Sequence, residues 1–165
     1  MRILGIDPGT GIVGFGVVDV QSGGRYTLID AGVIRTPVKE ALPDVLDTIF
    51  KELTEIIKHN QPDQISVEKL FFSQNVKTAI SVSHARGVIL LAAKQAGLEI
   101  GEYTPQQIKQ ALTGYGKAKK DQVQTMVQTI LQLDTPIKQD DCADAIAAAI
   151  CHAMSIGSYN VASSL

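Results

Sequence analysis

The fold is organised around a stretch near the amino terminus, Ile3-Leu4-Gly5-Ile6-Asp7-Pro8-Gly9-Thr10-Gly11. Its first four residues are mostly apolar, as in a central strand that is buried on both faces of a sheet. The apolar run ends on an acid, and the Pro-Gly pair that follows breaks the strand at once. Residues 12–20 are again mostly apolar and predict a second strand. The two strands should form a hairpin, with Asp7 at the end of its first strand, next to the turn.

The carboxyl group of Asp7 is an unusual choice for the end of a buried strand. An isolated buried carboxylate loses its solvation, so it must be hydrogen-bonded, paired with a cation or bound to a metal. A turn role is equally consistent with this stretch, because an Asp side chain can cap a Pro-Gly turn. The stretch by itself leaves both roles open.

The rest of the chain alternates between strand and helix patterns. Strands are expected at 25–36, 64–68 and 98–103, and helices at 43–60, 76–95, 105–112, 123–131 and 139–156. Residues 113–120 are expected to form a flexible basic loop. A strand that follows a crossover helix is most economically parallel to the first strand, so the strand ending at Glu68 should lie beside the one ending at Asp7. The sequence therefore predicts an α/β fold, a five-stranded mixed sheet with helices on both faces.

Length and composition favour a single domain in a reducing, intracellular compartment. The chain has 165 residues and a net charge of −2. No apolar run is long enough for a membrane span, and no signal peptide is visible. Cys142 and Cys151 fall on opposite faces of one predicted helix, so they cannot pair within it. We therefore expect a cytoplasmic protein. Residues 69–138 are basic between acidic ends, which suits a polyanion-binding surface, although chance gives the same pattern.

Four acids are expected to converge on one edge of the sheet. Asp7 and Glu68 end parallel neighbouring strands and so share the carboxyl-end rim, where open α/β sheets bind ligands. Asp141 and Asp144 lie three residues apart and project from one face of the last helix. Either helix acid alone is explained by the helix dipole. Four acids together indicate a bound cation, and an all-oxygen ligand set favours Mg²⁺ or Mn²⁺.

Motifs spread over nearly the whole chain resemble the RuvC family of bacterial Holliday junction resolvases, in the RNase H-like superfamily. They are Gly5-Ile6-Asp7-Pro8-Gly9, Val67-Glu68-Lys69-Leu70-Phe71, Ala85-Arg86-Gly87-Val88, Gln107-Ile108-Lys109-Gln110, Lys120-Asp121-Gln122-Val123-Gln124 and Asp141-Cys142-Ala143-Asp144-Ala145. The resemblance implies an RNase H-like nuclease domain over residues 1–157, followed by a short disordered tail at 158–165. This tail is shorter and less basic than in many members, and Asp140 adds an acid beside the four.

The resemblance also implies a function, in homologous recombination and DNA repair. It predicts a crossover junction endodeoxyribonuclease that resolves four-way junction DNA by paired, symmetric nicks in two strands of like polarity. The family's catalytic and metal-binding acids match Asp7, Glu68, Asp141 and Asp144. The implied cofactor is Mg²⁺, with Mn²⁺ as a substitute and two ions per site. The implied partners are a second copy of the chain and a RuvA/RuvB-like branch-migration helicase complex, in the bacterial cytoplasm.

The DNA-binding residues are expected to be an aromatic wedge and a basic set. Phe71 matches the family's wedge, which stacks on junction bases, whereas Phe72 is expected in the core. The candidate phosphate contacts are Lys109, Lys117, Lys119 and Lys120, of which the resemblance supports the first and last most strongly. A solvated basic loop is the alternative for these lysines.

Other functions fit the sequence less well. Actin-like ATPases and sugar kinases share the Ile-Asp-x-Gly-Thr pattern but need two such domains. A non-catalytic junction-binding module would not need four acids. A related RNase H-like nuclease acting on RNA or on other branched DNA remains an alternative that a substrate panel decides.

A two-fold symmetric dimer is expected, because a four-way junction needs two matched nicks and each chain carries one set of acids. The helix at 76–95 is the candidate interface, with apolar residues at Val76, Ile80, Ile89 and Ala93. A helix buried on both sides within its own domain is the alternative.

Overall fold

The computed structural model describes residues 1–36, 40–70 and 76–162. The strands are β1 (Arg2–Asp7), β2 (Ile12–Val20), β3 (Tyr26–Arg35), β4 (Gln64–Glu68) and β5 (Glu99–Tyr103). The helices are α1 (Leu42–Asn60), α2 (Val76–Gln95), α3 (Pro105–Thr113), α4 (Lys120–Leu131) and α5 (Asp140–Ala162). Among these helices, none is both long enough and apolar enough to cross a membrane.

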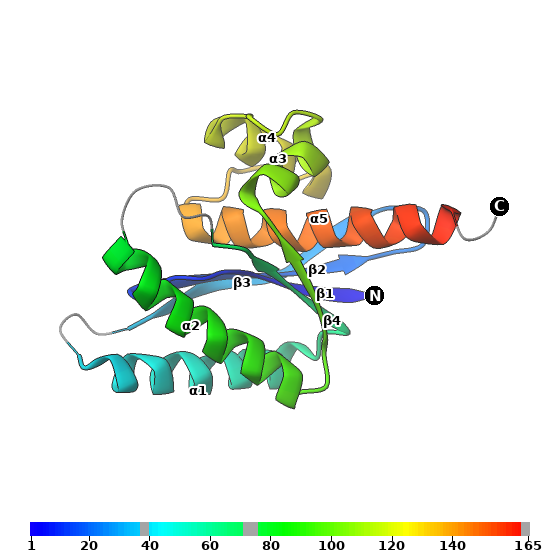
Figure 1. Ribbon diagram of the computed structural model, residues 1–165. Helices are drawn as coiled ribbons and strands as arrows, with labels where there is room; N and C mark the ends of the chain where they lie inside the picture. The colour runs from blue at the N-terminus through cyan, green and yellow to red at the C-terminus, as the bar shows by residue number, and fades with distance from the viewer. Residues whose placement is uncertain (37–39, 71–75, 163–165) are drawn as a thin grey trace.

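The strands form one mixed sheet in the order β3-β2-β1-β4-β5 (Figure 1). β1, β2 and β3 pair antiparallel, as expected of two successive hairpins. β4 lies beside β1 and parallel to it, and β5 continues the parallel half. The predicted five-stranded mixed sheet, with the strands of Asp7 and Glu68 as parallel neighbours, is confirmed.

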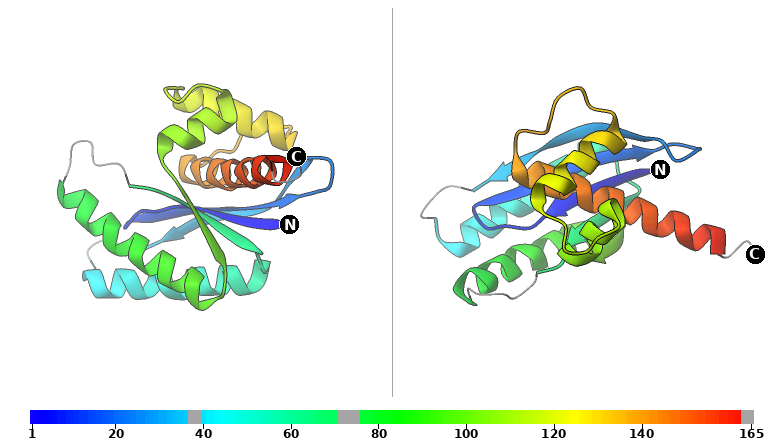
Figure 2. Two further views of the ribbon diagram at one scale, coloured as in Figure 1. Left: turned by 45° about the vertical axis from the view of Figure 1, so that its right-hand side comes forward. Right: turned by 90° about the horizontal axis from the view of Figure 1, so that it is seen from above.

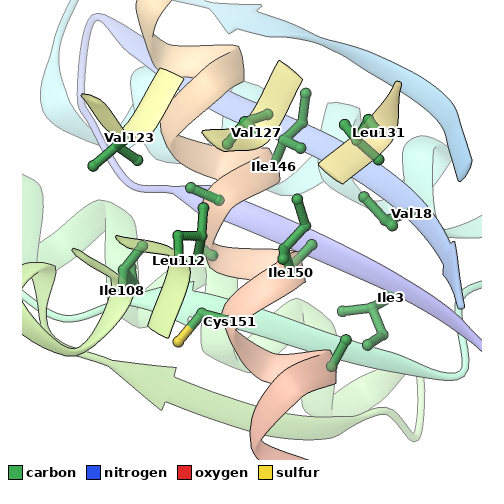
Figure 3. Packing of buried hydrophobic residues seen from close by; sticks show 14 of the residues in the cluster. Ile3, Val18, Ile108, Leu112, Val123, Val127, Leu131, Ile146, Ile150 and Cys151 are labelled. Atoms are coloured by element: carbon green, nitrogen blue, oxygen red, sulfur yellow. The ribbon is translucent and has the colours of Figure 1, made fainter. Parts of the chain in front are cut away.

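Helices cover both faces of this sheet. α1 and α2 pack on one face, and α5 crosses the other, with α3 and α4 outside it (Figures 1 and 2). A hydrophobic core lies on each face of the sheet, and successive side chains of β1 contribute to one core and then to the other. Ile3 points to the α5 side, whereas Leu4 and Ile6 point to the α1–α2 side. Figure 3 shows Ile146 and Ile150 of α5 packed among side chains of α4, β1 and β2. The central strand is therefore buried on both faces, as its apolar run predicts.

α2 has one buried and one exposed side. Ala85 and Ile89 are completely buried against the sheet, as is Ala93. Ile80 and Leu91, by contrast, each keep 53% of their surface exposed. Of the apolar residues that predict an interface on this helix, Ile89 and Ala93 therefore belong to the core-facing stripe, and Ile80 lies outside it. The alternative of a helix buried on both sides is wrong. Val76 lies at the start of α2, and its side chain is outside the described residues.

Two helix boundaries differ from the prediction by more than one residue. Lys120 begins α4 instead of ending the preceding loop, because Lys119 takes the extended N-cap position and its backbone N–H donates to the side chain of Gln122. α5 continues to Ala162, six residues beyond the expected end at Ile156. Gly157 does not end the helix, because it lacks the positive φ that a helix-ending glycine adopts.

Candidate active site

Asp7 and Glu68 meet at the carboxyl-end rim because of strand register. Ile6 of β1 pairs with Val67 of β4, so the two acids follow one position later on adjacent parallel strands. Side chains alternate along a strand, and Ile6 and Val67 both point toward α1 and α2. Asp7 and Glu68 therefore both point to the opposite face, under the start of α5, and both are half-buried there.

Two glycines let α5 approach this rim closely. A Cβ atom on Gly5 would stand 1.9 Å from the carbonyl oxygen of Ala145, and one on Gly14 would stand 2.1 Å from that of Asp141. Any side chain at either position would push the helix away from the sheet. Because glycine has no side chain, the first turns of α5 can lie directly on the sheet at these two positions. This places Asp141 and Asp144 at the level of Asp7.

Burial and mutual repulsion perturb two of the four acids. Loss of hydration, followed by the charges of Asp144 and Asp141, raises the pKa of Asp7 from 3.8 to about 7. Burial, followed by the charges of Asp7 and Asp144, raises the pKa of Glu68 from 4.5 to about 8. Each of the four carboxylates therefore interacts electrostatically with at least one of the others. The predicted convergence of strand ends and helix start is present in the structure.

Lys120 and Lys109 lie next to these acids. The ammonium of Lys120 is 2.9 Å from Oδ2 of Asp144 and 3.4 Å from Oδ2 of Asp140. Both lysines lower the pKa of Glu68 against the effect of its burial. They also line a cavity of about 230 Å³ between α3, α4 and α5, together with Glu68, Pro105, Ile108, Val123, Asp144 and Ala147. The site is thus a carboxylate cluster with two lysine ammonium groups beside it.

The remaining predicted site residues lie away from this cluster. Lys117 and Lys119 are exposed in the connection between α3 and α4, and no contact within the described parts of the chain joins them to the acids. Phe71 and Phe72 fall outside the described residues. Sequence reasoning did not identify Gly14, whose role depends on the path of α5. It also gave no role to Asp140, which contacts Lys120.

The donor set suits a hard divalent cation. All four groups are carboxylates, and two of them are costly to ionise without a nearby positive charge. Across residues 1–36, 40–70 and 76–162, no three or more His, Cys, Asp or Glu side chains already stand in a metal-binding arrangement. Asp144 is engaged by Lys120 instead. The chemistry of these donors therefore fits a hard divalent cation, and binding of such an ion by Asp144 would require the ammonium of Lys120 to move.

The raised pKa values predict a pH-dependent stability of the metal-free protein. For Asp7, with a pKa of 3.8 in the unfolded chain and about 7 in the fold, the protonated form is favoured by folding. Its contribution to stability is full below the unfolded value and is lost as pH rises through the folded value. In chelator-treated protein, Asp7→Asn should therefore gain stability relative to the unchanged chain between about pH 5 and 8. Thermal unfolding across this range checks it, and parallel Tm curves for the two proteins would contradict it.

Comparison with known proteins supports a specific family. The family model of crossover junction endodeoxyribonuclease RuvC matches residues 3–152. RuvC of Alkaliphilus oremlandii is 52% identical over 153 residues, which are 93% of each chain. The structure of Thermus thermophilus RuvC has a TM-score of 0.89 at 34% identity, over 96% of both chains. T. thermophilus RuvC in complex with a Holliday junction substrate has a TM-score of 0.87 at 32% identity, over the same share.

These matches extend over the sheet, the helices and the acidic rim alike. The α/β architecture is the RNase H-like fold that the sequence motifs predict. Because the family model covers most of the chain and the relatives match it almost end to end, the chain belongs to the RuvC family of crossover junction endodeoxyribonucleases.

Proposed function

We propose that this protein resolves Holliday junctions by paired, symmetric nicks in two strands of like polarity, through metal-dependent hydrolysis of phosphodiester bonds. Its setting would be homologous recombination and DNA repair. The main support is the gathering of four carboxylates at one sheet rim in a chain of the RuvC family. A complete acidic set beside two cations favours an enzyme over a junction-binding module without activity.

The catalytic and metal-binding residues we propose are Asp7, Glu68, Asp141 and Asp144. They would hold Mg²⁺, for which Mn²⁺ substitutes, with two ions per site. When bound, such ions activate water for in-line attack on phosphorus and stabilise the leaving oxygen. The carboxylates orient these charges against the scissile phosphate. The half-buried position of Asp7 and Glu68 limits solvent around the reacting atoms.

Lys109 and Lys120 would hold the DNA backbone at this site. Both line the same cavity as Glu68, so a phosphate bound there would be near positive charge as well as near the carboxylates. Lys117 and Lys119, exposed on the adjoining loop, extend the basic surface over which the duplex would run. Phe71 would act as the aromatic wedge that stacks on junction bases.

A substrate panel tests this function. With Mg²⁺ present, we expect cleavage of a mobile four-way junction and much slower or no cleavage of a linear duplex, a three-way fork or an RNA–DNA hybrid. The products should carry 5′-phosphate and 3′-hydroxyl ends. Preferential cutting of the hybrid would instead make this chain a ribonuclease on the same fold. Cutting of all branched substrates at equal rates would remove the specificity for four-way junctions.

We further propose that the working unit is a two-fold symmetric dimer that forms through α2. Ile80, His84, Gly87 and Leu91 are exposed along one stripe of this helix. A Cβ atom on Gly87 would meet no atom within 4 Å, so the stripe has room for a close partner helix. Apolar side chains as exposed as Ile80 and Leu91 gain stability when they are covered. A dimer of this kind would carry two acidic sites for the two symmetric strands.

The dimer is tested by placing a charge on this stripe. Leu91→Asp should shift the protein from dimer to monomer in sedimentation at micromolar concentration, because burial of an unpaired carboxylate opposes association. On a plasmid with an extruded cruciform, the variant should give nicked circles where the unchanged protein gives linear DNA. Ile29→Asp, at an apolar residue of β3 that is 43% exposed, is the matched control and should stay dimeric. A Leu91→Asp protein that still sediments as a dimer would exclude this face.

Family membership supports three further proposals. Residues 1–157 would form the nuclease domain, and a RuvA/RuvB-like branch-migration complex would be its partner in the bacterial cytoplasm.

A further inference from the structure

Asp140 lies outside the four carboxylates but is connected to them through Lys120. The ammonium of Lys120 is 3.4 Å from Oδ2 of Asp140 and 2.9 Å from Oδ2 of Asp144. The other oxygen of Asp140, Oδ1, accepts a hydrogen bond of 2.9 Å from the side-chain amide of Gln124. One cation is thus shared between two carboxylates, and one of these is held from its far side by a neutral amide.

The geometry of two helices creates this arrangement. Lys120 and Gln124 are one turn apart at the start of α4, so their side chains project from the same face of that helix. Asp140 is the first residue of α5 and lies four positions before Asp144. Gln124 engages one oxygen of Asp140 and leaves the other directed at Lys120.

Folding does not require this arrangement. The side chain of Asp140 is 64% exposed and that of Lys120 is 49% exposed, so their ion pair is strongly solvated. Solvated ion pairs contribute little to the stability of a fold. The side chain of Asp144, by contrast, is only 29% exposed, and its contact with Lys120 is the shorter of the two. The arrangement instead provides Asp140 as a second carboxylate for the ammonium of Lys120, besides Asp144.

We propose that Asp140 is a positioning residue that gives Lys120 a second binding place, so that Asp144 can be released to a divalent cation. This inference rests on the proposed function, in which Asp144 is a metal ligand. Lys120 and a metal ion compete for Asp144, because an ammonium and a divalent cation cannot occupy the same carboxylate oxygen. With Asp140 present, Lys120 exchanges one carboxylate for another instead of moving into bulk solvent. It also stays at the wall of the cavity, where a DNA phosphate would meet it.

Metal affinity measured without DNA tests this role. In calorimetric titrations with Mn²⁺, Asp140→Asn should weaken binding about fivefold, because Lys120 then loses its alternative partner and occupies Asp144 more fully. In a Lys120→Met background, the same substitution should change Mn²⁺ affinity by less than about twofold, because the competitor is absent. Gln124→Ala changes no charge but frees Asp140 to turn away, so it should weaken Mn²⁺ binding in the same direction by a smaller factor.

Asp121→Asn is the matched charge control. Asp121 is exposed beside Lys120 in the first turn of α4, and its side chain accepts a hydrogen bond from the backbone N–H of Gln122. Its loss should leave Mn²⁺ affinity unchanged. Equal weakening by Asp140→Asn with and without Lys120 would overturn the proposal, because Asp140 would then act on the ion by charge alone. Unchanged affinity in Asp140→Asn would overturn it as well.

These outcomes are distinct from a failure of the proposed function. A chain that binds Mn²⁺ with the expected dependence on Asp140 but cuts no junction would contradict the function and leave the positioning role in place. A chain that binds no Mn²⁺, or binds it equally well after Asp7→Asn, would contradict the metal site and this inference together.

Discussion

Asp7→Asn is expected to reduce junction cleavage by about a thousandfold or more, the loss that follows when several kcal/mol of metal-based transition-state stabilisation is removed. Asp7 lies at the centre of the acidic rim, where it faces the charges of Asp144 and Asp141 and where burial raises its pKa to about 7. The amide keeps the size of the side chain but removes the charge that a divalent cation needs. Single-turnover cleavage with Mg²⁺ measures the effect.

Junction binding should survive this substitution, and it should improve slightly because one negative charge near the DNA phosphates is removed. Gel-shift titration in a chelator separates binding from cleavage. Glu68→Gln, Asp141→Asn and Asp144→Asn should behave in the same way. Asp134→Asn, at an exposed acid between α4 and α5, is the control and should cut normally. Full cleavage by any one of the four variants would remove that residue from the catalytic set.

Gly14→Ala is expected to have the second-largest effect. The added methyl group would stand 2.1 Å from the carbonyl oxygen of Asp141, which belongs to the backbone of α5 and cannot rotate away. We expect a loss of about 1–3 kcal/mol of folding stability, as in other overpacked contacts. Cleavage should fall by about a hundredfold, because a displacement of about 1 Å at a catalytic group has that cost. Urea unfolding and single-turnover cleavage measure the two losses separately.

Gly11→Ala is the matched control, in the turn of the same hairpin. A Cβ atom there would meet nothing within 4 Å, so stability and cleavage should both stay close to those of the unchanged protein. Normal cleavage by a folded Gly14→Ala protein would show that the acidic rim tolerates a shift of α5. The close approach of α5 at Gly14 would then not be needed to place the carboxylates.

Most of the fold could be read from the sequence because its signals are local. The apolar run before Asp7 predicts a central buried strand, and Ile3, Leu4 and Ile6 are completely buried. Strands β2 and β4 and helix α2 begin and end where the hydrophobic pattern predicts. Boundaries were missed where a cap decided them, as at Lys119, or where a glycine continues a helix instead of ending it, as Gly157 does in α5.

The acidic set could be predicted because two of its members follow from strand topology and two from helix spacing. A crossover helix makes β1 and β4 parallel neighbours, and their carboxyl ends must then share a rim. The spacing of Asp141 and Asp144 at the start of the last helix added these two, and the family motif favoured Asp141 over Asp140. Surface assignments on α2 needed the tertiary structure, since periodicity does not tell which of Ile80 and Ile89 faces the core.

The sequence by itself determined the element order, the mixed sheet, the family and the four acids that meet at one rim. Only the tertiary structure decided how closely α5 approaches the sheet at Gly14, which side of α2 is left uncovered, and that Lys120 is shared between Asp140 and Asp144. The physical reason is the sequence distance between the interacting residues. Hydrophobic periodicity and strand order can be recognised from residues close together in the chain. Backbone clearances and shared ion pairs instead depend on distant segments that meet within a few ångströms.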